Sequence, residues 1–287
     1  MLLFNTSNTD YLVQRLPFKR GAVLVKKFSD GELYVKLLDP IADGTPVCVI
    51  ASTQAPAENL LELFFLLDAL HRSNARIYVL FTYFGYARQD RVALGESFAA
   101  HVIAQILKSF ALTNMVIVHA HSQNLHELFN FTNKIPFELF CAAAQRCQAT
   151  IVAPDTGAVM LASSVAHSCA LETVFISKIR PMQEEVVITS ISGEVRGKNL
   201  LLVDDIIATG NTIMGAATFL KEHGAKSISV FVTHGVFTNH ACERIAACAA
   251  IDALYVTNSL PQQENSKKII VVDIVPFIEK IIIELRS

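Results

Sequence analysis

The fold of this chain is decided by the stretch LLLVDDIIATGNT, residues 200–212. Its first four residues are apolar without interruption, which is typical of a strand buried on both faces of a parallel sheet. Two carboxylates and a turn of small residues follow. Apolar residues then recur at helical spacing from Ile213 to Leu220, and Gly224 is a suitable end for the helix. The stretch therefore predicts a buried strand, a turn and a helix.

The turn in this stretch has the composition of a phosphate-binding loop. In an open parallel sheet, ligands bind beyond the carboxyl ends of the strands. The small residues 208–212 let backbone N–H groups converge on an anion, and the helix start adds partial positive charge. Asp204 and Asp205 suit hydroxyl groups or a metal ion beside that anion, so the turn predicts a ribose-phosphate site. A plain strand–turn–helix is the alternative, but burying two adjacent acids without partners would be costly.

Composition and charge narrow the class of protein. The 287 residues suffice for one large domain or two ordinary ones, and the 52% hydrophobic content supplies a core. The formal charge of −2 gives no reason to expect nucleic acid or an anionic membrane as partner. We find no signal peptide, no bilayer-spanning run and no C-x-x-C pair among the six cysteines. We therefore expect a cytoplasmic protein whose cysteines are small buried hydrophobes and form neither disulfides nor a zinc site.

Apolar strand-like runs alternate with helical patterns along the chain, which predicts an α/β fold with parallel sheets. One cycle of these patterns ends with a strand at 115–118, and a similar cycle begins with a strand at 150–153. We therefore expect two similar domains at residues 1–136 and 137–287. The last helix, residues 276–285, could pack on either domain.

Two loops in the first half carry candidate functional residues. The loop FSDGE, residues 28–32, lies between two strand-like runs, although Asp-Gly also favours a simple tight turn. The loop YFGYARQDR, residues 83–91, follows a predicted strand. Aromatic rings beside arginines suit a purine ring with phosphates, through stacking and two-pronged hydrogen bonds. A solvated charged loop is the alternative for this second segment.

Three further strand ends carry possible metal ligands and cations. The segments HAH, residues 119–121, and PDTG, residues 154–157, follow two predicted strands, and a histidine of the first and Asp155 of the second could share one divalent ion, although Mg²⁺ prefers oxygen ligands. Lys178 and Arg180 lie in a polar segment, residues 177–185. Cations on a mobile loop near bound phosphates could close over a reacting centre, whereas the alternative is an exposed hairpin loop.

These segments occur together, and in the same order, in the ribose-phosphate pyrophosphokinases (phosphoribosyl pyrophosphate synthetases), and the chain resembles this family nearly end to end. The resemblance implies two phosphoribosyltransferase-like domains, each a parallel sheet flanked by helices. It implies transfer of the diphosphoryl group of ATP to O1 of ribose 5-phosphate, with Mg²⁺, to give 5-phosphoribosyl 1-diphosphate and AMP. It also implies a homo-oligomer in which neighbouring subunits share an ATP site.

The resemblance also implies roles for individual residues. The ATP-binding positions are Phe28, Asp30, Gly31, Glu32, Arg88 and Gln89. The positions for ribose 5-phosphate are Arg180, Asp204, Asp205, Thr209, Gly210, Asn211 and Thr212. Lys178 and Arg180 match the catalytic flexible loop, and His121 and Asp155 match the metal-associated positions.

The chain departs from the common family pattern in several places. Ala208 and Asn211 stand where common bacterial and animal enzymes have an acid and a second glycine, and Ile179 stands where an additional arginine is common. With a short segment at 95–97, these features suggest a short, archaeal-like branch. A non-catalytic relative that assembles with active subunits and a phosphoribosyltransferase are the alternatives. The loops at 28–32 and 83–91 argue against the phosphoribosyltransferase.

Overall fold

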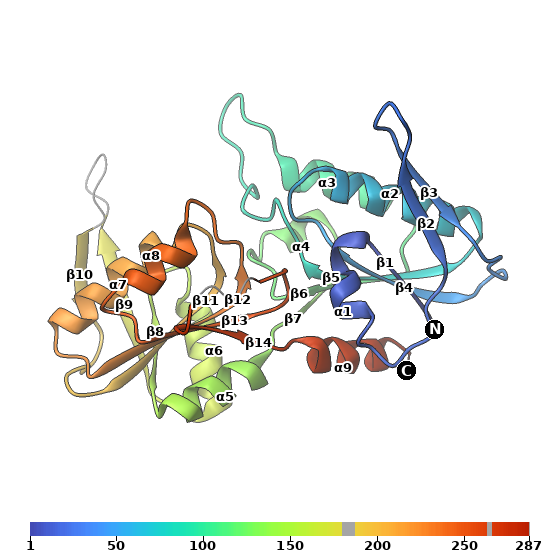
Figure 1. Cartoon of the computed structure of the whole chain (residues 1–287). Coiled ribbons are helices and arrows are strands. Elements are labelled where there is room, and N and C mark those ends of the chain that lie inside the picture. The colour runs from blue at the N-terminus through green and yellow to red at the C-terminus, as the bar shows by residue number, and fades with distance from the viewer. Residues whose placement is uncertain (180–186, 263–265, 287) are drawn as a thin grey trace. The chain divides into compact units, whose positions relative to one another are not determined.

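The computed structural model describes residues 1–179, 187–262 and 266–286 (Figure 1). The chain forms two compact units, one of Met1–Ile135 with Ile274–Ser287 and one of Pro136–Asp273. Helix α9 (Val275–Arg286), at the end of the chain, therefore belongs to the first unit. Among the described residues, no helix is long and apolar enough to cross a bilayer.

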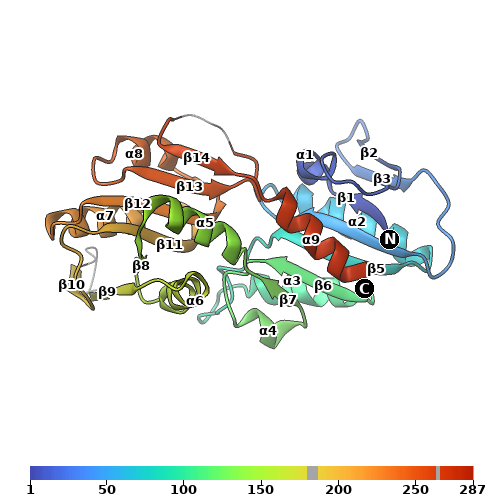
Figure 2. The ribbon, with the colours of Figure 1, turned by 90° about the horizontal axis from the view of Figure 1, so that it is seen from below.

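The first unit is built on a parallel sheet with the strand order β1-β4-β5-β6-β7. Its strands are β1 (Leu2–Asn5), β4 (Pro46–Ser52), β5 (Arg76–Tyr83), β6 (Asn114–Val118) and β7 (Thr132–Lys134). Helices α2 (Glu58–Arg72) and α3 (Ala99–Lys108) cover one face, and α1 (Asp10–Val13) and α9 cover the other (Figures 1 and 2). A separate antiparallel hairpin, β2 (Val23–Lys27) and β3 (Leu33–Leu37), packs on α2. Short elements η1 (Ser7–Thr9) and α4 (Leu125–Leu128) complete the unit.

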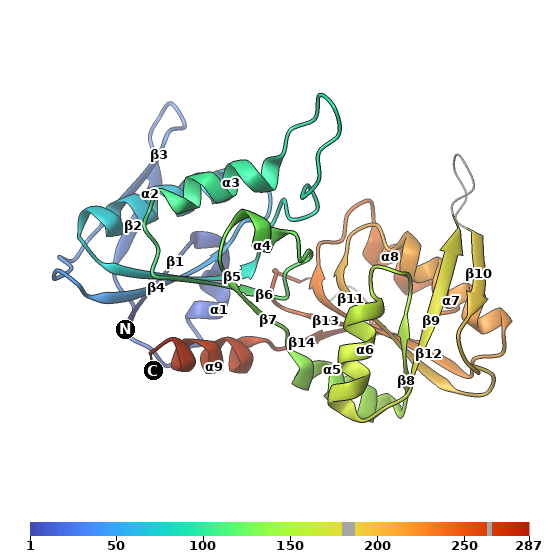
Figure 3. The same ribbon diagram turned by 180° about the vertical axis from the view of Figure 1, so that it is seen from behind.

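The second unit is built on a larger sheet with the strand order β10-β9-β8-β11-β12-β13-β14. Its strands are β8 (Thr150–Ala153), β9 (Thr173–Ile179), β10 (Val187–Ile191), β11 (Asn199–Ile207), β12 (Ser227–Gly235), β13 (Ala253–Thr257) and β14 (Ile269–Val272). Every described pair of neighbours is parallel except β9 and β10. Helices α7 (Asn211–Glu222) and α8 (Ala241–Ala247) cover one face, and α5 (Phe137–Cys147) and α6 (Val159–Cys169) cover the other (Figure 3).

The connections of the second unit diverge from the neighbouring strands β8 and β11. Helix α6 leads from β8 to β9 on one side, whereas α7 leads from β11 to β12 on the other side. The turns after β8 and β11 therefore start from adjacent strand ends and separate. Open α/β sheets bind ligands at this kind of point, so the topology alone marks these two turns.

The predicted α/β fold with parallel sheets flanked by helices is confirmed. Within the stretch 200–212, β11 ends at Ile207 and α7 begins at Asn211, and Gly224 follows the helix with φ of 89°. Helix α5 and the short strands β1, β13 and β14 were not predicted from the sequence. Strands of four or five residues give little periodic signal, which explains why the three strands were missed.

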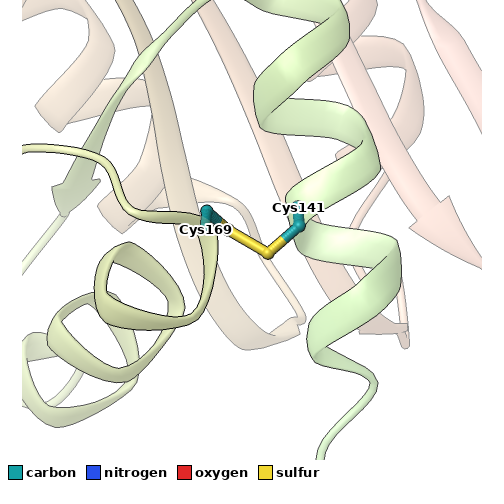
Figure 4. The surroundings of a disulfide bond; sticks show 2 residues. All are labelled: Cys141 and Cys169. Atoms are coloured by element: carbon teal, nitrogen blue, oxygen red, sulfur yellow. A yellow bond between two sulfur atoms is a disulfide. The ribbon is translucent and has the colours of Figure 1, made fainter.

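Cys141 on α5 and Cys169 at the end of α6 form a disulfide, with their Cα atoms 5.3 Å apart (Figure 4). The expectation that the cysteines form no disulfides was therefore wrong. The other four, Cys48, Cys147, Cys242 and Cys248, remain thiols. The two bonded residues are 28 positions apart and meet only because α5 packs on α6. A cross-link over such a separation typically stabilises the fold by about 3 kcal/mol.

Candidate functional site

The turn between β11 and α7 presents backbone amides at the carboxyl end of the sheet. Gly210 has φ of 75°, and a Cβ there would lie 3.0 Å from Ile245 Cδ1 of α8, so the position favours glycine. No described side chain caps α7, which begins at the exposed residue Asn211. The first N–H groups of a helix have no partner within the helix, so this turn suits an anion.

Three carboxylates gather beside this turn. Asp204 Oδ1 accepts the N–H of Asp205 at 3.0 Å, and Asp205 Oδ1 accepts the N–H of Ile206 at 2.8 Å. Burial raises the pKa of Asp204 well above its usual value, and the nearby charges of Asp205 and Asp155 raise it further. Such a group of oxygens attracts hydroxyl donors or a cation, as the sequence analysis expected for the two aspartates of β11.

Asp155 lies in the turn between β8 and α6, where its Oδ1 accepts the N–H groups of Gly157 at 3.0 Å and Ala158 at 3.3 Å. Within residues 1–179, 187–262 and 266–286, no three His, Cys, Asp or Glu side chains form a ready metal cluster. Mg²⁺ in phosphate-transfer sites needs only one or two carboxylates, because water and phosphate oxygens supply the other ligands. The oxygen-rich ends of β8 and β11 therefore fit Mg²⁺ bound together with a phosphate ligand.

Asp204→Asn is expected to raise the melting temperature at pH 7. Because the folded-state pKa of Asp204 is raised, the unfolded chain loses this proton at a lower pH than the folded chain. The resulting penalty is absent below the unfolded pKa of about 3.9 and grows as the pH rises toward the folded pKa. Asparagine removes it, so melting curves should show a gain on the order of a few degrees at pH 7.

The gain from Asp204→Asn should shrink as the pH is lowered toward 4. Glu222→Gln, at an exposed acid near the end of α7, is the matched control and should leave the melting temperature unchanged at each pH. An Asp204→Asn variant that melts below the wild type at pH 7 would show that the carboxylate stabilises the fold instead.

In the first unit, the loop 83–91 follows β5 and the segment 119–124 follows the neighbouring strand β6. Arg88 and Gln89 are exposed. They belong to the lining of an open pocket of about 370 Å³, formed by Arg88, Gln89, Arg91, Glu96 and Ser97. Gly85 permits the close approach of this loop, because a Cβ there would lie 2.4 Å from the carbonyl oxygen of Thr53. The two residues predicted to bind ATP phosphates and base thus lie together on one surface.

The aromatic residues of this loop do not all serve as predicted. Tyr83 and Phe84 are buried, and the Phe84 ring packs edge-on against Phe81 with centroids 5.1 Å apart. Their rings therefore belong to the core, and the expectation that they stack on a purine was wrong. Tyr86 is only partly buried.

Asp90 joins the two loops of the first unit, and the sequence analysis did not single it out. Its Oδ2 accepts hydrogen bonds from Ser122 Oγ and from Asn124 Nδ2, the latter at 2.9 Å. Burial raises the pKa of Asp90, but the donors Ser122 and Asn124 and the charge of Arg91 outweigh it, so the pKa lies below its usual value. An ionised Asp90 therefore fixes the arginine-bearing loop against the segment after β6.

The two histidines of the HAH segment lie in different environments. His119 is 4% exposed, has φ of 45°, and its N–H donates to the carbonyl of Lys134 at 2.9 Å. His121, the predicted metal-associated residue, is exposed. It belongs to the first unit whereas Asp155 belongs to the second, so a metal shared by the two stays a prediction. The buried His119, just after β6, is the other histidine of this segment that could serve as a metal ligand.

The FSDGE residues form the tip of the β2–β3 hairpin. Phe28 N–H donates to the carbonyl of Glu32 at 2.8 Å, and Glu32 N–H donates to Asp30 Oδ1 at 3.0 Å. Gly31 has φ of 92°, as such a turn requires. All of these residues are exposed, with Phe28 at 46%. The hairpin therefore holds one aromatic ring and two acids in a fixed turn at its tip.

The predicted catalytic cations cannot be placed in the same way. Lys178 lies in β9, but its side chain falls outside the described residues, as does Arg180 altogether. Strands β9 and β10, which pair antiparallel, stand on either side of this gap.

Comparisons with known proteins agree with this arrangement. Residues 2–110 match the N-terminal domain of ribose phosphate pyrophosphokinase, and residues 164–285 match the phosphoribosyl synthetase-associated domain. A ribose-phosphate pyrophosphokinase of Campylobacter jejuni is 38% identical over 90% of this chain and 85% of its own length. The one of Mycoplasma pneumoniae is 32% identical over 98% of this chain and 91% of its own length.

The structure resembles that of a phosphoribosylpyrophosphate synthetase from Mycobacterium smegmatis, with a TM-score of 0.85 and 29% identity, over 100% of this chain and 98% of that one. The chain belongs to the ribose-phosphate pyrophosphokinase family. The expected likeness to a short archaeal branch is not borne out, since these relatives are bacterial.

Proposed function

We propose that this protein transfers the diphosphoryl group of ATP to O1 of ribose 5-phosphate, forming 5-phosphoribosyl 1-diphosphate and AMP for nucleotide biosynthesis. The observation that carries the proposal is the amide-lined turn beside three carboxylates at the ends of β8 and β11, in a chain of this family. A phosphate and a pair of ribose hydroxyls are the ligand that such a site would recognise.

Ribose 5-phosphate would bind at the end of β11. The backbone amides of residues 209–212, with the hydroxyls of Thr209 and Thr212, would hold the 5-phosphate at the start of α7. Asp204 and Asp205 would accept hydrogen bonds from the ribose hydroxyls. Holding both ends of the sugar would direct the 1-hydroxyl toward the β-phosphorus of ATP, which is the main task of a phosphoryl-transfer enzyme.

ATP would bind mainly on the first unit. Arg88 and Gln89, which line the open pocket, would hold the phosphates and base. Lys178 and Arg180 would contact the reacting phosphates, and Arg180 would also contact ribose 5-phosphate. Asp155 and His121 would hold Mg²⁺, and this ion supplies charge neutralisation on the transferred group.

The hairpin tip would complete the ATP site of a neighbouring subunit. Phe28, Asp30, Gly31 and Glu32 are all exposed in this chain, so their own unit does not bury them. We therefore expect a homo-oligomer, and sedimentation at assay concentration should show at least a dimer. The variant Phe28→Ala should raise the Michaelis constant for ATP, while Leu38→Ala, at another exposed apolar residue just beyond β3, should not. Fully active monomers would contradict the shared site.

The reaction itself is tested by mixing the purified protein with ATP, Mg²⁺ and ribose 5-phosphate and identifying the nucleotide product. AMP and 5-phosphoribosyl 1-diphosphate in equal amounts are expected. ADP as the sole product would contradict diphosphoryl transfer. Conversion of 5-phosphoribosyl 1-diphosphate and a nucleobase into a nucleotide would instead favour a phosphoribosyltransferase. A protein that has no turnover of its own but activates another subunit would favour a non-catalytic relative.

A further inference from the structure

Arg244 of α8 reaches the phosphate-binding turn from outside it. Its Nη2 donates to Asn211 Oδ1 at 2.6 Å, and its Nη1 lies 3.4 Å from the carbonyl oxygen of Thr209. One planar guanidinium therefore contacts both ends of the turn, which a single ammonium group would not do with the same geometry. The sequence analysis gave no role to this arginine, which lies 33 residues beyond Asn211.

The position of α8 against the turn is fixed by its neighbours. Ile245, next to Arg244, is fully buried and lies beside Gly210, where an added Cβ would be 3.0 Å from its Cδ1. Backbone hydrogen bonds hold the segment that leads into α8. Val236 N and Phe237 N donate to the carbonyl of Ile207 at 2.9 and 3.2 Å, and Thr238 N donates to that of Ala208 at 3.0 Å. Arg244 is thus carried by a well-fixed element.

Asn211 creates a specific problem for anion binding. Asparagine side chains can accept hydrogen bonds from neighbouring backbone N–H groups, and Asn211 is the first residue of α7. Those are the donors that a phosphate would need at α7. Here the Asn211 oxygen is bonded to Arg244, and no described side chain caps α7.

We propose that Arg244 is a positioning residue of the ribose 5-phosphate site, because it draws the Asn211 side chain away from the first amides of α7. This inference rests on the proposed function and adds a residue to that site. The effect of substituting Arg244 on the binding of ribose 5-phosphate should therefore depend on the side chain of Asn211. Without the asparagine side chain there is nothing to draw away.

A double-mutant cycle tests this dependence. Kinetic constants are measured for the wild type, Arg244→Ala, Asn211→Ala and the double variant. Arg244→Ala alone should raise the Michaelis constant for ribose 5-phosphate about tenfold, the size of one lost hydrogen bond to a charged group. Turnover and the Michaelis constant for ATP should change little. In the Asn211→Ala background, the same change should have almost no effect.

Two further variants sharpen the result. Arg244→Lys keeps the charge but cannot contact Asn211 and Thr209 together, so it should behave more like the alanine variant than like the wild type. Arg196→Ala is the matched control, since this exposed arginine precedes β11 at the opposite end of the strand. It should leave both Michaelis constants unchanged. Melting curves check that all variants are folded.

Three outcomes would overturn the inference: wild-type constants in Arg244→Ala, an equal loss with and without the Asn211 side chain, or full function in Arg244→Lys. Calorimetric titration with ribose 5-phosphate measures the same dependence without turnover. An inactive wild type that still binds ribose 5-phosphate would count against the proposed reaction. An active wild type together with an Arg244→Ala variant that binds ribose 5-phosphate equally well would count against this inference alone.

Discussion

Lys178→Ala and Arg180→Ala are each expected to lower turnover by roughly 10²–10³, the usual loss when one preorganised charge contact is removed. Both cations belong to the segment that the family resemblance assigns to catalysis. If they meet the phosphates only when that segment closes, their contacts are stronger in the transition state than in the ground state. Such groups raise turnover without strengthening substrate binding. ATP binding measured by calorimetry should therefore stay near the wild-type value.

The controls for this pair are Lys226→Ala and Arg196→Ala, at exposed residues in other parts of the second unit. Both should retain wild-type turnover. Arg180→Lys should also be harmful, because a point charge does not reproduce a planar two-pronged donor. Near-normal turnover in both alanine variants would remove this segment from the mechanism and direct attention to Arg88 and Arg91.

Asp205→Ala is expected to raise the Michaelis constant for ribose 5-phosphate by roughly tenfold to a hundredfold, the equivalent of about 1–3 kcal/mol. The variant removes an acceptor for a ribose hydroxyl, and it also leaves the Ile206 N–H without the carboxylate that accepts it at 2.8 Å. The Michaelis constant for ATP should rise much less. Asp204→Ala should show the same split between the two substrates.

Initial rates at varied concentrations of each substrate measure this split. Glu222→Ala, near the end of α7, serves as the control acid and should alter neither constant. An equal rise in both Michaelis constants would mean that the aspartates do not bind the ribose hydroxyls. Asparagine at position 205 separates the lost charge from the lost acceptor, because its amide oxygen can still accept a hydrogen bond.

The architecture of the second unit was predictable because its signals are local. Residues 200–203 of β11 are fully buried, so they form an unbroken apolar run in the sequence, and the turn that leads to α7 contains Gly210. The buried strand, the turn and the helix all follow from neighbouring residues, although β11 continues through the two aspartates to Ile207 and α7 already begins at Asn211. The same holds for the FSDGE turn, which Asp30 and Gly31 form within a few positions.

The remaining features depend on residues that meet only after packing. Arg244 approaches Asn211 because α8 lies on the turn, and Cys141 approaches Cys169 because α5 lies on α6. Asp90 is one acid in a charged loop until Ser122 and Asn124 contact it from the segment after the neighbouring strand β6. Neither composition nor periodicity carries such pairings, so the sequence indicated a phosphate site without showing what surrounds it.

Because helix α9 belongs to the first unit but follows the second unit in the chain, the two units are completed at different times during synthesis. The second unit is one continuous segment, Pro136–Asp273, and can fold as soon as that segment has left the ribosome. The first unit is begun before the second, yet its helix α9, which buries Phe277, Ile278 and Ile282, follows the second unit in the chain and is made after it. At ordinary translation speeds this delay is on the order of ten seconds. The unit that is begun first is therefore completed after the other one, and its uncovered apolar surface must stay out of harmful contacts until α9 has been made.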